Sequence, residues 1–207
     1  MPDLRLLPFL LLPIFSFSQD WKTINADDGS LTELKKELAS MESIKGDIRQ
    51  EKSFSFLTEK LISTGRFIYR KEAQLRWEFT DPIEYIILIN GSTMRLKEEG
   101  EEKKYKGMNR ILRQVKEIIL GCIDGSIMDD PDYRTAFSVN GETIRIQLQP
   151  KAKELKEFIK QIGVEFLRNG AVLQKVRLVD SSGDETSIEF SAIETNSGID
   201  EAAFADF

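Results

Sequence analysis

Residues 65–91 read GRFIYRKEAQLRWEFTDPIEYIILING, and this stretch carries most of the information about the fold. Within it, Leu75, Trp77 and Phe79 alternate with polar side chains. Because successive side chains of a β-strand point to opposite faces, this spacing predicts a strand with one apolar face and one solvated face. Pro82 then ends the strand, since proline has no backbone N–H to donate to a sheet.

A second strand is expected after the proline, over residues 83–89. Its side chains are apolar on both faces, and the turn dipeptide Asn90-Gly91 ends it. Such a strand offers more apolar surface than one thin sheet needs, and the 13 phenylalanines of the chain add to this surplus.

Two helices are expected outside this stretch. Ser30 and Glu33 have the spacing of a capping box, and leucines recur on one face of the residues that follow. Residues 108–123 have the strongest amphipathic pattern in the chain, and Gly125 lies just beyond it. The apolar face of this central segment is formed by Ile111, Leu112, Val115, Ile118, Ile119 and Cys122.

The rest of the chain reads as short strands joined by tight turns. Asn140-Gly141, Asn169-Gly170 and Ser182-Gly183 predict hairpins, and hairpins join antiparallel neighbours. The total is about nine to eleven strands, so the predicted fold class is mainly β. A sheet of this kind either closes as a barrel or curls around an inserted element.

Three further local predictions concern the segments between these strands. Residues 48–56 alternate weakly, and residues 57–62 predict another strand that turns at 63–65. Residues 151–161 follow a proline and carry apolar side chains at helical spacing, so a short helix is expected there.

Length, charge and the first residues limit the class of protein. The 207 residues suit one domain, and 29 basic against 35 acidic residues give a net charge of -6 without a basic stripe, so nucleic-acid binding is not expected. Residues 6–15 are apolar and follow Arg5, and Ser16 and Ser18 suit a signal peptidase. We therefore expect a cleaved signal peptide at 1–18 and an exported single domain at 19–207.

The chain has few of the residues that catalytic sites commonly use. It contains no histidine, which excludes the common triads, zinc sites and near-neutral proton shuttles. Cys122 lies on an apolar helical face, where a thiolate is disfavoured. Asp129, Asp130 and Asp132 do not have the spacing of a calcium loop and are interpreted as a solvated acidic loop. We expect neither catalysis, nor a metal, nor a cofactor.

The order of these motifs resembles the LolA family of periplasmic lipoprotein carriers. That family also has a Gly-led strand, a strand like the Arg-Trp-Glu one here, a proline, and an apolar strand ending in Asp/Asn-Gly. The likeness recurs at residues 148–151, at the Asp-Gly turn and Thr-rich strand of 180–190, and in the ending from Asn196 to Phe204. It extends over essentially all of residues 19–207.

The resemblance implies an unclosed antiparallel β-barrel whose apolar concave side is covered by helices. It also implies a chaperone in the periplasm that shelters the acyl chains of lipoproteins and carries them from the inner to the outer membrane. The expected partners are acylated lipoproteins, an inner-membrane lipoprotein-releasing transporter, and an outer-membrane acceptor or the membrane itself. The carrier is expected to be a monomer.

Three groups of residues are assigned on this basis. The sheet side of the lipid-binding cavity is expected to consist of Leu75, Trp77, Phe79, Ile87 and Ile89. The movable lid is expected to carry Ile111, Leu112, Val115, Ile118, Ile119 and Cys122. The family closes its lid with an arginine before a proline; the corresponding pair here is Lys71-Glu72, with Arg70 just before it, so Arg70 and Lys71 are the candidates for the latch.

Two alternatives stay open at the level of the sequence. The central helix can be a permanent plug in the core or a movable lid, because both bury the same face. The scaffold can also serve an envelope lipid-binding, glycolipid-binding or sensor module that interacts with another protein.

Overall fold

The computed structural model describes residues 21–103 and 110–207, so the expected signal peptide at 1–18 lies outside the described residues. Strands occupy β1 Lys22–Ile24, β2 Ser43–Ser53, β3 Lys60–Arg70, β4 Gln74–Asp81, β5 Tyr85–Asn90, β6 Thr93–Glu98, β7 Glu101–Lys103, β8 Tyr133–Asn140, β9 Thr143–Pro150, β10 Ile159–Leu167, β11 Val172–Asp180 and β12 Glu185–Thr195. Helices occupy α1 Gly29–Ser40, α2 Arg110–Asp124 and α3 Lys153–Lys156, with 3-10 turns η1 Ser126–Asp129 and η2 Glu201–Phe204.

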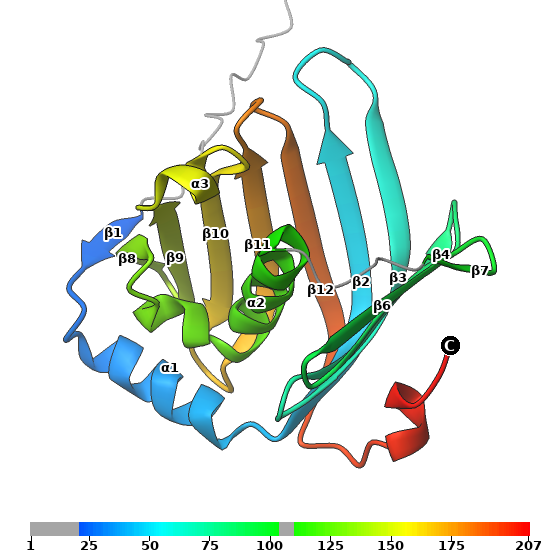
Figure 1. Ribbon diagram of the computed structural model, residues 1–207. Coiled ribbons are helices and arrows are strands. Elements are labelled where there is room, and N and C mark those ends of the chain that lie inside the picture. The colour runs from blue at the N-terminus through cyan, green and yellow to red at the C-terminus, as the bar shows by residue number, and fades with distance from the viewer. Residues whose placement is uncertain (1–20, 104–109) are drawn as a thin grey trace, which may run out of the picture.

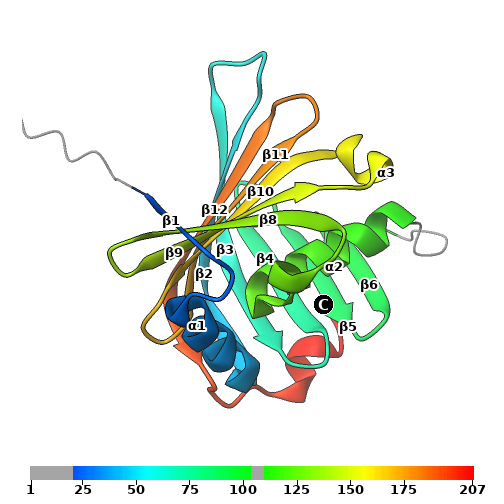
Figure 2. The same ribbon diagram turned by 90° about the vertical axis from the view of Figure 1, so that its left-hand side faces the viewer.

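The strands form one curled antiparallel sheet. Their order is β1-β8-β9-β10-β11-β12-β2-β3-β4-β5-β6-β7, and Figures 1 and 2 show the sheet wrapping around α2. Within the described residues the two end strands, β1 and β7, each pair with a single neighbour, so the barrel is unclosed. The mainly β, unclosed antiparallel fold predicted from the sequence is confirmed, with 12 strands. The three-residue β1 was not expected.

The centre of the sheet joins segments that are far apart in the chain. β12 pairs with β2 from Glu185 opposite Ser53 to Thr195 opposite Ile44, with a register shift between Ser191 and Glu194. Every other pair in the sheet joins strands that are consecutive in sequence, except β1 with β8. The β12–β2 pair therefore holds the two halves of the trough together.

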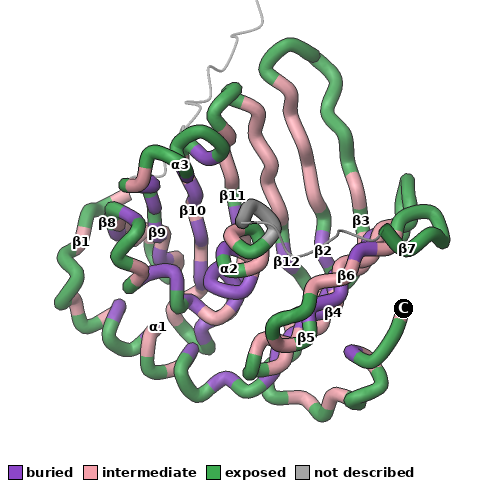
Figure 3. Tube along the Cα trace, viewed as in Figure 1, coloured by how far each residue is buried: buried purple, intermediate pink, exposed green. Residues whose placement is uncertain are grey.

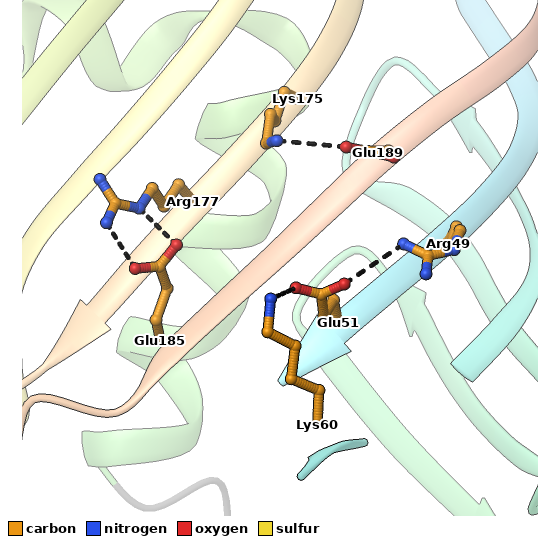
Figure 4. Close-up of polar contacts among 7 residues, drawn as sticks. All are labelled: Arg49, Glu51, Lys60, Lys175, Arg177, Glu185 and Glu189. Atoms are coloured by element: carbon orange, nitrogen blue, oxygen red, sulfur yellow. Dashed lines mark hydrogen bonds and ion pairs between the residues drawn. The ribbon is translucent and has the colours of Figure 1, made fainter. Parts of the chain in front are cut away.

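The two faces of the sheet differ in polarity. The concave face carries the core, including Ile48, Phe67 and Trp77, which are 5% exposed or less. Figure 4 shows the convex face, where ion pairs cross from strand to strand, such as Lys175 with Glu189 at 3.1 Å. Exposed pairs of this kind contribute about 0–1 kcal/mol each, so apolar burial on the concave face holds the fold.

The β2–β3 hairpin differs from the prediction. The expected turn at residues 63–65 is wrong, because β3 runs without interruption from Lys60 to Arg70 and the loop lies at residues 54–59. Gly65 serves a different purpose, since a Cβ built on it would lie 1.9 Å from the carbonyl oxygen of Glu78. The glycine permits a close approach of β4 at a register shift between Thr64 and Gly65.

The two shorter helices also correct local predictions. The N-cap of α1 is Asp28, not Ser30, because the Asp28 carboxylate accepts a hydrogen bond from the Ser30 backbone N–H at 2.9 Å. The expected helix at 151–161 shrinks to the single turn of α3, since Ile159 is already paired in β10 opposite Asp180.

The C-terminal residues cover the outer side of β5. The turn η2 packs against β4 and β5, and Phe204 is 1% exposed. Leu88 points to this convex side and is 2% exposed, which explains why β5 is apolar on both faces. Arg95 fixes the end of the chain through Asp206 at 3.1 Å and through the ring of Phe207, 4.4 Å from the guanidinium carbon.

Candidate functional site

The helix α2 lies inside the trough, and its C-terminal half is firmly packed. Ile118, Cys122 and Ile123 are 8%, 3% and 1% exposed. The left-handed backbone at Gly125, with φ of 76°, turns the chain back into η1, which packs on α2. The end of α2 nearest η1 is therefore part of the core.

The preceding turns of α2 are more open. Val115 is 38% exposed, and Ile119 is half-buried at the edge of a cavity. Arg113 and Glu117 are exposed on the other faces of the helix, as its amphipathic pattern predicts. The side chains of Ile111 and Leu112, assigned to the lid, lie outside the described residues.

An apolar cavity of about 320 Å³ separates this part of α2 from the sheet. Its walls are Trp77, Phe79, Ile83, Tyr85 and Ile87 from the β4–β5 region, Ile188 from β12 and Ile119 from α2, with Gln50, Ser63 and Glu98 among them. The volume falls at the lower end of the range of small-ligand sites, about 300–1,000 Å³.

The residues assigned to the sheet side fall into two sets. Trp77, Phe79 and Ile87 line the cavity. Leu75 and Ile89 are 0% exposed and belong to the core. The structure thus brings three of the five residues to the space next to α2.

An aromatic cluster forms the floor of this region. The ring centroids of Phe67, Trp77 and Phe190 lie 5.2–5.8 Å apart, and Phe79 lies 6.3 Å from Trp77. Edge-to-face contacts of this kind stabilise by about 0.5–1.5 kcal/mol each beyond burial. Phe190, like the cavity residues Tyr85 and Ile188, was not assigned to the site from the sequence.

The basic residues expected to close the lid have partners on other elements. Arg70 donates to Gln74 at 2.6 Å and stacks 5.3 Å from the Phe204 ring. Lys71 donates to the carbonyl oxygen of Ala39 at 2.9 Å, at the end of α1. Both side chains therefore stabilise the outer parts of the fold in this structure.

Two other hydrogen bonds tie α2 to the sheet. The Tyr69 hydroxyl donates to Asp124 at 3.1 Å, and the Lys116 ammonium donates to the carbonyl oxygen of Gly91 at 3.2 Å. Burial and the nearby Asp124 carboxylate raise the pKa of Tyr69, so the hydroxyl keeps its proton at neutral pH. Neither residue was identified from the sequence, because both contacts join segments far apart in the chain.

A second cavity, of about 410 Å³, borders α2 on its other side. Glu117, Asp130, Asp132 and Tyr133 are among the polar residues that line it. Burial, with Asp130 nearby, raises the pKa of Tyr133 to about 12. Cavities therefore lie on both sides of α2, and the second borders the helix from Gln114 to Asp124.

The other groups considered from the sequence are the Cys122 thiol and the acidic loop at residues 129–132. Burial raises the pKa of the Cys122 thiol to about 12. Asp129 accepts a hydrogen bond from Lys35 at 2.6 Å. Across residues 21–103 and 110–207 there is no group of three histidine, cysteine or acidic side chains that could hold a metal ion, and no helix there has the length and apolar character to cross a membrane.

The family model and the related sequences indicate one family. Residues 39–206 match the family model described as outer membrane lipoprotein carrier protein LolA. The outer-membrane lipoprotein carrier protein of Cupriavidus pinatubonensis is 24% identical over 148 residues, 69% of this chain and 65% of that relative. The chain thus spans about two thirds of that relative's length.

Two further proteins extend the comparison. The carrier of the same name from Pseudomonas fluorescens is 24% identical over 196 residues, 94% of this chain and 91% of the relative. A crystal structure of a LolA superfamily protein from Nitrosomonas europaea has a TM-score of 0.44 and 9% identity, covering 86% of this chain and 96% of that chain. Since the family model extends over most of its length, the chain belongs to the LolA family of outer membrane lipoprotein carrier proteins.

Proposed function

We propose that this protein is a non-catalytic periplasmic chaperone that carries acylated lipoproteins from the inner to the outer membrane. The observation that supports this most directly is the apolar cavity between Trp77 of the sheet and Ile119 of α2. Family membership supplies the class of cargo, and the cavity supplies a place for an acyl chain.

In the proposed cycle, α2 is a lid that occupies part of the trough while no cargo is bound. Its C-terminal half stays packed through Ile123 and η1, and its preceding turns move away from Ile87 and Phe79. An inner-membrane lipoprotein-releasing transporter would load the cargo, and an outer-membrane acceptor or the membrane would receive it. The assigned cavity and lid residues keep these roles as part of the proposal.

The energetics suit a carrier that must also release its cargo. Burying an acyl chain gains about 0.8 kcal/mol per methylene group, so a long chain in an open trough would bind too tightly to be passed on. Opening α2 exposes the apolar side chain of Ile119, which offsets part of that gain. The net affinity is then low enough for a downstream acceptor to compete.

The Lys116–Gly91 contact is proposed to hold the lid closed, and the Tyr69–Asp124 contact is proposed to fix the C-terminal half of α2 that stays packed. They join α2 to the ends of β3 and β5 in the observed arrangement. Arg70 and Lys71 would assist only if they left their present partners.

Lipoprotein release from spheroplasts tests the proposal. The variant Ile119→Asp puts a carboxylate against the acyl chain and is expected to lower release about tenfold or more. The control Gln114→Glu adds the same charge to α2 at a residue that lines the polar cavity, and is expected to release cargo like the wild type.

Two outcomes would overturn carriage of lipoproteins. One is normal release by a folded Ile119→Asp protein. The other is native mass spectrometry of protein isolated from its own periplasm in which a glycolipid, and no triacylated lipoprotein, is bound. That second result would establish the alternative of an envelope glycolipid-binding module.

A further inference from the structure

One end of the sheet gathers nearly all of the exposed large apolar side chains. Seven such side chains are exposed among the described residues, and Val115 of α2 is the only one elsewhere. The other six form what we call the apolar rim: Phe56, Leu57, Leu61, Ile62, Ile83 and Phe158.

The topology of the sheet places these residues together. In an antiparallel sheet of this strand order, the β2–β3, β4–β5, β6–β7, β9–β10 and β11–β12 connections emerge at the same end; in Figure 1 the β2–β3 turn is at the top and the β4–β5 turn at the right. Hydrogen bonds link three of them: Ser55 donates to Asp184 at 2.8 Å, and the backbone N–H of Ser181 donates to Phe158 at 3.2 Å. The rim residues therefore lie at one end of the sheet, and hydrogen bonds join the β2–β3, β11–β12 and β9–β10 connections there.

The β2–β3 hairpin projects beyond the other connections. Figures 1 and 2 show it extending past the β11–β12 turn, and Figure 3 shows that its tip is exposed. At this tip Phe56 is 76% and Leu57 55% exposed. The Lys52 ammonium lies 5.0 Å from the Phe54 ring centroid, so a cation sits just behind the apolar tip.

Next to the rim lies a cationic cavity of about 450 Å³. Its lining includes Arg134, Lys151, Lys156 and Lys160, and none of its lining residues carries a carboxylate. This concentration of positive charge contrasts with the net charge of -6 of the whole chain. An anionic group therefore complements this cavity, while the β6–β7 turn at the same end of the sheet carries Glu98, Glu99, Glu101 and Glu102.

We propose that the apolar rim docks the protein on the surface of a lipid bilayer that contains anionic headgroups. Phe56 and Leu57 enter the boundary between headgroups and acyl chains, as apolar side chains of peripheral proteins do. Lys156 and Lys160 then contact lipid phosphates, and Lys52 reaches the headgroup level from behind the tip.

A bilayer fits this surface better than a folded protein partner. The apolar side chains come from three separate connections, four of them from the projecting β2–β3 hairpin, and the cavity that Ile83 borders faces α2. A fluid lipid surface adapts to such a shape, and it offers both the apolar layer and the anionic layer that the rim and the cationic cavity require.

Flotation with vesicles tests the proposal, using protein without residues 1–18. The wild type is expected to float with vesicles of phosphatidylethanolamine and phosphatidylglycerol, and to bind phosphatidylcholine vesicles more weakly. The double variant Phe56→Ser/Leu57→Ser is expected to lose about tenfold or more of its binding. Thermal melts check that this variant is folded, since both side chains are exposed.

Charge variants provide the matched comparison. Lys156→Gln/Lys160→Gln is expected to lower binding to the anionic vesicles about tenfold or more. The control Lys22→Gln/Lys36→Gln makes the same change in net charge at exposed lysines of β1 and α1 and is expected to bind normally.

Absence of wild-type binding to the anionic vesicles at low salt would overturn the proposal. Unchanged binding by the folded Phe56→Ser/Leu57→Ser variant would also overturn it. The same holds if Phe56 and Leu57 were needed to retain a protein partner but not to bind vesicles. The assay contains neither lipoprotein nor transporter, so its result does not depend on whether the cavity next to α2 carries acyl chains.

Discussion

At the scale of single residues, two glycines show whether a neighbouring backbone leaves room for a side chain. Gly65 and Gly163 both lie inside strands, but their surroundings differ. A Cβ at Gly65 would lie 1.9 Å from the Glu78 carbonyl oxygen, whereas one at Gly163 would meet Arg177 at 3.8 Å. The first position excludes every side chain, and the second tolerates a methyl group.

Gly65→Ala is therefore expected to destabilise the fold by about 3 kcal/mol or more, because the atom it would strike belongs to the backbone and cannot rotate away. Urea unfolding measures this change. Gly163→Ala is the matched control, and its free energy of unfolding is expected to stay within about 1 kcal/mol of the wild type. Equal stability of the two variants would show that β3 and β4 can separate easily.

At the scale of elements, α2 has two differently packed parts. Its C-terminal half is buried with Cys122 and held by Tyr69, while Val115 and Ile119 in its middle are partly exposed. This division makes a local opening of the helix cheaper than unfolding of the sheet.

Tyr69→Phe is expected to speed up modification of Cys122 by a thiol reagent about fivefold, because it removes one hydrogen bond that contributes about 1 kcal/mol to holding the C-terminal half of α2 in place. The wild-type thiol should react slowly, since it is buried and its pKa is raised to about 12. Lys71→Gln, which loses a contact to α1, is the control and should leave the rate unchanged. If Lys71→Gln instead sped up Cys122 modification and Tyr69→Phe did not, Lys71 would be the residue that protects this thiol.

At the scale of the whole molecule, acidic side chains of the convex face link stability to pH. Burial opposes the charge on Glu78, but hydrogen bonds from Arg66 and Arg76, at 3.1 and 3.3 Å, outweigh it and hold the pKa below its ordinary value of 4.5. A carboxylate with a lowered folded-state pKa stabilises the protein above the unfolded-state value, and this stabilisation is lost as the pH falls.

The free energy of unfolding is therefore expected to decrease as the pH falls below about 4.5, and Glu78→Gln is expected to flatten that decrease. Denaturation series at several pH values measure both slopes. Glu33→Gln removes one carboxylate from the exposed face of α1 and serves as the control. If Glu78→Gln and Glu33→Gln gave the same slope, the arginine contacts would not contribute.

The sequence predicts those parts of this molecule that depend on local periodicity. Alternation at Leu75, Trp77 and Phe79 identifies β4, and helical spacing identifies α2. The position of Gly65 against Glu78 and the pairing of Tyr69 with Asp124 depend on contacts between distant segments, so no local pattern reveals them. Phe190 could have joined the predicted site, since Ile188 and Phe190 alternate on β12.

The pairing of β12 with β2 has a consequence for how the chain reaches its final form. β12, the last strand of the sheet in chain order, completes its middle opposite β2, one of the first. The two halves of the trough cannot be joined until β12 has been made, and contacts over such sequence separations form slowly. A ribosome-bound chain that lacks β12 therefore has two hairpin arrays without the pairing that joins them.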